Sequence, residues 1–128
     1  MGFQTISARE LNRCVHENRW MIIDLRSPEE YRACHIRGAA NIPYEELEEL
    51  LSDPGKAVRA SVFELLRDRG FSVGNPLGQE LVLYCERGAT SMAAARELAE
   101  LGFGVKSVVG GIHAYRGPYL EGTDRQFR

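Results

Sequence analysis

Short runs of apolar residues alternate along the chain with segments whose apolar positions recur at helical spacing. The runs at 21–25 (MIIDL) and 81–84 (LVLY) are short and rich in branched side chains, which is typical of buried β-strands. Between residues 58 and 66, apolar side chains stand at i, i+4, i+7 and i+8, so this pattern predicts a helix that ends near Gly70. Strands separated by helices in this order predict an α/β fold with a central, mostly parallel sheet and helices on both faces.

Polar residues mark where two further helices begin. Ser7 is followed three residues later by Glu10, and Ser27 is followed in the same way by Glu30, which is the spacing of a capping box. Pro28 fits the first position of a helix, where its missing N–H is not needed. We therefore expect one helix to start after Ser7 and another after Ser27.

The remaining segments read as connections and short elements. Residues 38–43 predict a turn that leads into a short strand or extended segment, and residues 45–51 predict a brief acidic helix. Residues 71–79 contain two glycines and a proline, and they predict a surface loop before the second strand run. Residues 117–128 have little periodicity, so we expect a loosely packed tail there.

Composition narrows the class of protein. A length of 128 residues favours a single domain over residues 1–128. A formal net charge of −2 provides no basic field, which disfavours nucleic acid as a partner. The sequence has no apolar stretch of membrane-spanning length and no signal-peptide pattern, so we expect no membrane partner. Three cysteines without close pairing indicate a reducing compartment, so we expect a cytoplasmic protein. Cys14 falls at helical spacing with apolar neighbours, so we expect it to be a small core residue.

Cys85 stands at the carboxyl end of the strand predicted at 81–84, and a polar, glycine-containing loop separates it from a strong helix pattern. In a parallel sheet this arrangement directs backbone N–H groups and the positive end of a helix dipole toward the sulfur. Such surroundings favour a reactive thiolate, whereas the structural alternative is a buried strand-end cysteine. The candidate site consists of Cys85 and the loop that follows it, formed by Glu86, Arg87, Gly88, Ala89, Thr90 and Ser91.

Two blocks of sequence carry a resemblance to a known family. Residues 24–43, DLRSPEEYRACHIRGAANIP, are similar to the pattern D-x-R-x-x-x-E-Y-x-x-G-H-I-x-G-A-x-N-I-P, with a departure at Cys34, where Gly is usual. Residues 84–91, YCERGATS, form the second block, and GGIHAY follows at 110–115. From about Ser7 to Arg116 the chain resembles the rhodanese (sulfurtransferase) family, which implies a rhodanese-like α/β fold.

The resemblance implies a sulfur-transfer reaction on Cys85. In that family the cysteine thiolate takes the outer sulfur of a donor, such as thiosulfate or a persulfide, and passes it to an acceptor such as cyanide or a thiol. The implied partners are thus a small sulfur-containing substrate or a protein persulfide, with neither a cofactor nor a metal. Gly88 allows the loop to turn tightly. Thr90 and Ser91 could donate their hydroxyls to the same anion or cap the following helix.

The charges of the loop bear on the sulfur donor. The loop is similar to the C-R-K-G-V-T loop of thiosulfate-specific family members, and Arg87 matches its second cationic position. Glu86 departs from it by placing a negative charge where those enzymes carry a positive one. Beside a dianionic donor this exchange costs on the order of 1–3 kcal/mol before salt screening, so we expect weak activity with thiosulfate. The alternative is that Glu86 points to solvent or pairs with Arg87 and has little effect.

The other polar residues of the first block are expected to be structural. Asp24 and Arg26 follow a strand, and in the family they tie the strand end to neighbouring backbone. His35 belongs to a motif that organises the chain, and Tyr115 stands where the family usually has Trp, so it is expected in the core. Cys34 replaces a helix-ending Gly, where a left-handed backbone would cost about 1 kcal/mol; as a thiol it could also act as a resolving partner for Cys85.

Two other classes of function are alternatives to sulfur transfer. Phosphatases and arsenate reductases of the related Cdc25-like branch need an arginine six places after the cysteine; Ser91 occupies that place, and Tyr84 stands where that branch has His. A non-catalytic binding or redox-sensing module is the remaining alternative. Inactive members typically lose the cysteine, whereas this chain keeps Cys85 in an intact loop.

Overall fold

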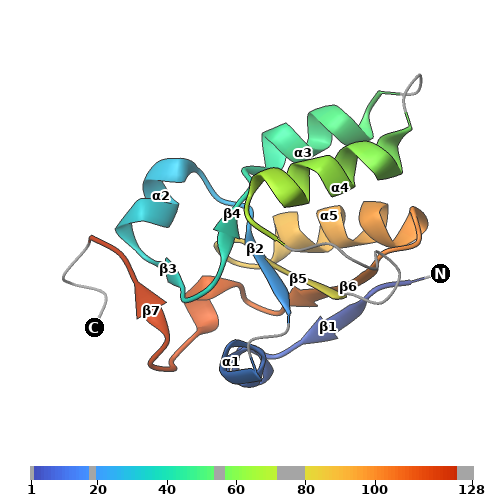
Figure 1. Ribbon diagram of the computed structural model, residues 1–128. Helices are drawn as coiled ribbons and strands as arrows, with labels where there is room; N and C mark the ends of the chain where they lie inside the picture. The colour runs from blue at the N-terminus through green and yellow to red at the C-terminus, as the bar shows by residue number, and fades with distance from the viewer. Residues whose placement is uncertain (1, 18–19, 54–56, 72–79, 124–128) are drawn as a thin grey trace.

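The fold is built on a five-stranded parallel sheet. The computed structural model describes residues 2–17, 20–53, 57–71 and 80–123. The sheet has the order β1-β6-β5-β2-β4, and all of its neighbouring strands are parallel (Figure 1). Its strands are β1 (Gln4–Ile6), β2 (Met21–Asp24), β4 (Ala40–Asn41), β5 (Glu80–Tyr84) and β6 (Gly104–Val108). The α/β fold predicted from the sequence is therefore confirmed.

Helices cover both faces of this sheet, as the alternation of strand side chains requires. In β5, Leu81 and Leu83 pack into one core cluster, whereas Val82 and Tyr84 pack into the other. Helices α3, α4 and α5 lie over the first face and α1 lies over the second (Figure 1). The helices are α1 (Ala8–Glu17), α2 (Pro28–Ala33), α3 (Tyr44–Leu51), α4 (Val58–Asp68), α5 (Ala89–Glu100) and the short 3₁₀ helix η1 (Ile112–Ala114).

The predicted helix starts are present. The Ser7 hydroxyl accepts the N–H of Glu10 while the Glu10 carboxylate accepts the N–H of Ser7. Ser27 and Glu30 form the same reciprocal pair at the start of α2. Cys14 is buried on α1, which confirms its place in the core.

The segment after residue 117 differs from the loosely packed tail expected from its sequence. Strand β7 (Leu120–Glu121) pairs in antiparallel fashion with β3 (His35–Ile36) in a small second sheet. The Thr123 N–H donates to the Arg32 carbonyl at 2.9 Å. The expectation was wrong for residues 117–123 because backbone hydrogen bonds hold this segment in place. A strand of two residues is too short to show an apolar period in the sequence.

Cys34 also differs from its expectation. It ends α2 with φ −164° and ψ 128°, an extended conformation that any residue adopts, so the expected left-handed cost does not arise. The close approach falls on Gly122 instead, where a Cβ would lie 2.3 Å from the Ala33 carbonyl oxygen. The predicted surface loop at 71–79 lies outside the described residues except for Phe71. None of the described helices has the length and apolar character needed to span a bilayer.

Candidate active site

The sulfur of Cys85 lies between the end of the central strand β5 and the start of α5. Strand β5 ends at Tyr84, and α5 begins at Ala89 with Gly88 as its N-cap. Gly88 has φ +110°, a left-handed conformation in which other residues are strained, so glycine is needed for this tight connection. Cys85 thus lies at the carboxyl edge of the sheet, where ligands of open α/β folds bind.

Backbone N–H groups converge on the Cys85 sulfur. The Gly88 N–H donates to Sγ at 3.1 Å and the Ser91 N–H donates at 3.3 Å. The N–H groups of Ala89 and Thr90 belong to the first turn of α5, where a helix offers no internal acceptor. This group of donors favours negative charge on the sulfur and on any atom attached to it.

The segment after β6 holds the loop in this conformation. The Ile112 N–H donates to the Cys85 carbonyl at 3.0 Å, and the His113 N–H donates to the Glu86 carbonyl at 3.1 Å. Gly111 lies against both carbonyls, and a Cβ there would come within 2.3 Å of the Cys85 oxygen. Because the two carbonyls are turned toward η1, the later N–H groups of the loop are free to face the sulfur.

The hydroxyls of the loop have different surroundings. Gly88 is the N-cap of α5 and no side chain caps this helix, so the capping role considered for Thr90 and Ser91 is absent. The Ser91 hydroxyl is buried and bonds to the Gly88 carbonyl at 3.1 Å and to the Ser107 hydroxyl at 2.7 Å. Ser91 therefore contacts the sulfur through its backbone, while Thr90 lies half-buried in the first turn of α5.

The charged residues of the loop face outward. Glu86, Arg87 and Ala89 are exposed. A Glu86 carboxylate oxygen lies 3.8 Å from Nη1 of Arg26, so its ion pair is with the first sequence block and not with Arg87. The Glu86 side chain is 48% exposed, and solvent weakens this pair.

Asp24 and Arg26 form a buried structural network beside the loop, as the sequence led us to expect. Asp24 is fully buried at the end of β2 and accepts the N–H, Nε and Nη2 groups of Arg26. Burial lowers the pKa of Arg26, but the hydrogen bond and charge of Asp24 outweigh it and hold this pKa above its usual value. Tyr84, next to Asp24 in strand register, accepts the Ile36 N–H at 3.0 Å. Burial, followed by the charge and hydrogen bond of Asp24, raises the pKa of Tyr84 well above its usual value.

His35 and Tyr115 are held by structural contacts. The His35 ring stacks on Tyr31 at 3.9 Å between centroids, and Nδ1 lies 2.6 Å from the Tyr31 carbonyl oxygen. Tyr115 is buried in the core, and its hydroxyl donates to Asn12 Oδ1 at 2.7 Å. Both placements agree with the structural roles expected for these residues; the suggestion that Cys34 is a resolving thiol stays a prediction.

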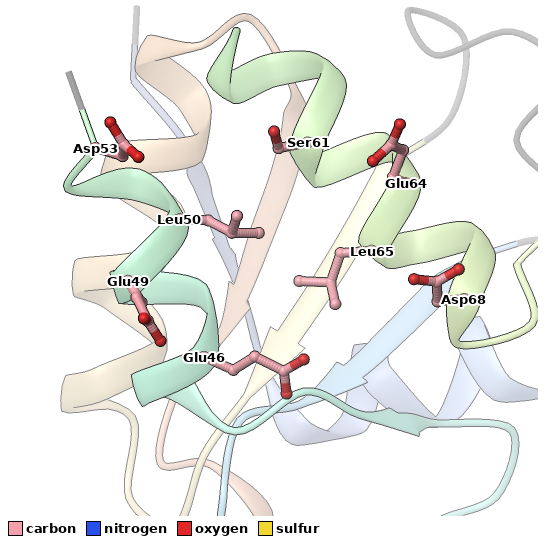
Figure 2. A pocket seen from close by; sticks show the side chains of 8 residues that line it. All are labelled: Glu46, Glu49, Leu50, Asp53, Ser61, Glu64, Leu65 and Asp68. Carbon is pink, nitrogen blue, oxygen red and sulfur yellow. The ribbon is translucent and has the colours of Figure 1, made fainter. Parts of the chain in front are cut away.

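The surface also has an acidic cleft, to which the Cys85 loop does not contribute. It has a volume of about 400 Å³ and lies between α3 and α4. Figure 2 shows its carboxylates, which come from both helices and from the turn after α3. They are Glu46, Glu49, Asp53, Glu64 and Asp68. Within the described part of the chain, no three His, Cys, Asp or Glu side chains are grouped so that they could hold a metal ion.

Two features of the site were not anticipated from the sequence. The contact between Glu86 and Arg26 joins residues that are 60 positions apart, and no local sequence pattern predicts it. The support from Gly111 had a visible signal, because the pair Gly110-Gly111 precedes η1 directly. A pair of glycines at a strand end indicates a close approach of backbones, although it does not say which carbonyl is approached.

Comparisons with known proteins agree with this geometry. The rhodanese-like domain family matches residues 7–117. The chain is 30% identical over 127 residues to the human thiosulfate:glutathione sulfurtransferase, covering 98% of this chain and 97% of that protein. It is 29% identical over 126 residues to the thiosulfate sulfurtransferase GlpE of Pseudoalteromonas translucida, covering 98% and 100%.

Solved structures show the same arrangement. The human single-domain sulfurtransferase TSTD1 superposes with a TM-score of 0.63 at 31% identity, covering 86% of this chain and 92% of that one. A rhodanese-like domain from Anabaena superposes with a TM-score of 0.69, covering 97% and 83%, and at 22% identity it supports the fold alone. The chain therefore belongs to the rhodanese-like sulfurtransferase family, which accounts for most of its length.

Proposed function

We propose that this protein transfers a sulfane sulfur from a donor to a thiophilic acceptor through a persulfide on Cys85. The observation that carries the proposal is the convergence of the Gly88 and Ser91 N–H groups on Sγ, with the first turn of α5 directly beyond. These donors favour an anionic sulfur and an anionic persulfide without a metal. The loop residues from Glu86 to Ser91 are the proposed substrate-binding site.

The reaction consists of two displacements at sulfur. The Cys85 thiolate attacks the outer sulfur of the donor, and the bond between that sulfur and the rest of the donor breaks; with thiosulfate, the electron pair leaves with sulfite. The acceptor thiolate, or cyanide, then attacks the outer sulfur of the persulfide. The S–S bond breaks and its electron pair returns to Cys85, so the enzyme is regenerated.

The loop charges favour a donor that is less anionic than thiosulfate. Relatives at about 30% identity are named thiosulfate sulfurtransferases, and the exposed Arg87 guanidinium can pair with a sulfonate group. The half-exposed Glu86 carboxylate of the same loop opposes a dianion. We therefore propose weak turnover of thiosulfate and better use of a persulfide, either small or carried by a protein in the cytoplasm.

Intact mass spectrometry tests the persulfide directly. The purified protein is exposed briefly to thiosulfate or, separately, to a polysulfide, beside Cys85→Ser and the matched control Cys34→Ser. We expect a gain of one sulfur atom in the wild type and in Cys34→Ser, reversed by cyanide, and no gain in Cys85→Ser. No gain with either donor would overturn the proposal and favour a binding or redox-sensing module.

A further inference from the structure

A cationic cleft opens beside the active-site edge. It has a volume of about 370 Å³ and lies between the first turns of α1 and the chain around η1. The residues that line it are Ala8, Arg9, Asn12, Ala114, Arg116 and Gly117, which we call the Arg9–Arg116 cleft. No acidic residue is among them, in contrast to the α3–α4 cleft. This lining fits an anionic ligand.

The two guanidinium groups retain hydrogen-bonding capacity. Nη1 of Arg116 donates to the carbonyls of His113 at 2.7 Å and Tyr115 at 3.0 Å, which holds the group beside η1. A guanidinium has five N–H donors, so several remain for a ligand. Arg9 is exposed, and among the described residues no carboxylate pairs with it.

Asn12 and Gly117 lie next to each other in the lining of the cleft, and Asn12 provides an amide group. The Tyr115 hydroxyl accepts the Tyr119 N–H and donates to Oδ1 of Asn12, so the amide offers its Nδ2 donors. A Cβ on Gly117 would meet Asn12 Oδ1 and the Tyr115 hydroxyl, both at 2.4 Å. Glycine at this position therefore keeps this part of the cleft open, because a side chain would displace the amide.

The cleft and the sulfur site lie at the same edge of the sheet. Strands β1, β6 and β5 are adjacent and parallel, so the segments that follow them leave the same edge of the sheet. The His113 N–H bonds to the loop of Cys85, and Arg116 follows only three residues later. Three residues span at most about 11 Å, so the backbone of Arg116 lies no further than this from the segment that bonds to the loop.

We propose that the Arg9–Arg116 cleft binds the carboxylates of an anionic thiol that accepts the sulfur of Cys85. This inference rests on the proposed function and names the class of acceptor. The bound thiol releases its proton to water, and its thiolate attacks the outer sulfur of the persulfide. The S–S bond of the persulfide breaks, the electron pair returns to Cys85, and the acceptor leaves as a persulfide.

The kinetic test compares two acceptors on protein that has been loaded with polysulfide. Glutathione carries two carboxylates, whereas 2-mercaptoethanol is neutral. We expect Arg9→Gln to slow discharge by glutathione about tenfold, the effect of losing about 1.4 kcal/mol of binding, and to leave discharge by 2-mercaptoethanol unchanged. The matched control is Arg13→Gln, an exposed arginine one turn further along α1 that does not line the cleft. Equal effects on both thiols, or none on either, would overturn the proposal.

A binding measurement separates this inference from the sulfur chemistry. S-methylglutathione cannot accept sulfur, so it is titrated into untreated protein while backbone amide shifts are followed by NMR. We expect shifts at Arg9, Asn12, Arg116 and Gly117 that are lost in Arg9→Gln, and shifts confined to the Cys85 loop would contradict the cleft. Loading of Cys85 is scored independently by mass, so a failed persulfide and a failed cleft give different results.

Discussion

Two polar regions lie side by side at the carboxyl edge of the sheet, and they use their hydrogen bonds differently. In the Asp24 network, at the ends of β2 and β5, a buried carboxylate is matched to Arg26 and Tyr84 within the protein. In the Cys85 loop, N–H groups converge on one sulfur, and the first turn of α5 leaves further donors without an internal acceptor. The difference indicates that charge at a strand end does not by itself predict a reactive site, whereas hydrogen-bond donors gathered around a thiol support the reactivity that we propose.

Replacing Asp24 should produce the largest change in stability. Asp24→Asn removes the buried counter-ion of the Arg26 guanidinium and leaves it only the half-exposed Glu86 carboxylate, which costs about 3–5 kcal/mol of the free energy of unfolding. Sulfur loading per folded molecule should be unchanged, because the loop donors are intact. Urea unfolding and mass spectrometry measure the two quantities. As a control, Glu80→Gln removes a partly exposed pair with Lys106 and should cost at most about 1 kcal/mol; a similar loss in both variants would contradict the buried network.

Gly111→Ala should reduce both the rate of sulfur loading and the free energy of unfolding. The new Cβ meets the carbonyls of Cys85 and Glu86 in a left-handed conformation, which costs about 1–3 kcal/mol. Displacing these carbonyls moves the N–H donors, so we expect sulfur loading to slow roughly 10–100-fold. Gly38→Ala is the matched control because it has φ +84° with open space around its Cβ position. Loading as fast in Gly111→Ala as in Gly38→Ala would show that η1 does not position the loop.

Tyr84 makes the network sensitive to alkaline pH. Its pKa is raised in the folded protein, so its contribution to stability is complete below about pH 10, the ordinary tyrosine value, and is lost as pH rises through the folded-state pKa. Tyr84→Phe should cost at least about 1 kcal/mol at pH 7, because the buried Ile36 N–H loses its acceptor.

Urea unfolding at pH 9 to 12 checks this dependence. The decline in unfolding free energy above pH 10 should be shallower in Tyr84→Phe than in the wild type, by up to about 1.4 kcal/mol per pH unit. Tyr44, whose pKa is raised to about 12 by burial and by its hydrogen bond to Glu97, provides the comparison through Tyr44→Phe. Parallel declines in the wild type and Tyr84→Phe would exclude Tyr84 as the titrating group.

Much of the architecture followed from local patterns, whereas the pairings between distant segments did not. The capping boxes, α4 and the strand–loop–helix around Cys85 were predictable because each depends on residues within one turn or one strand. The short strands β1 and β7 were not predicted, since two or three residues carry too little periodicity and their pairing depends on partners far along the chain. The same reason hid the contact of Glu86 with Arg26.

Glu86 lies in the Cys85 loop and contacts Arg26 of the Asp24 network, so it joins the two regions. Reversing its charge should have the smallest effect on stability, and it tests directly whether the charge of the loop limits thiosulfate turnover. Glu86→Arg should raise thiosulfate turnover about tenfold, because a repulsion with the dianionic donor becomes an attraction that salt partly screens. Stability should change by less than about 1 kcal/mol, since the pair with Arg26 is 3.8 Å long and its carboxylate is 48% exposed. Glu86→Gln removes the charge without reversing it and should give an intermediate turnover. If thiosulfate turnover falls in Glu86→Arg while loading by polysulfide is unchanged, the carboxylate holds Arg26 or the loop for the donor, and the charge argument is wrong.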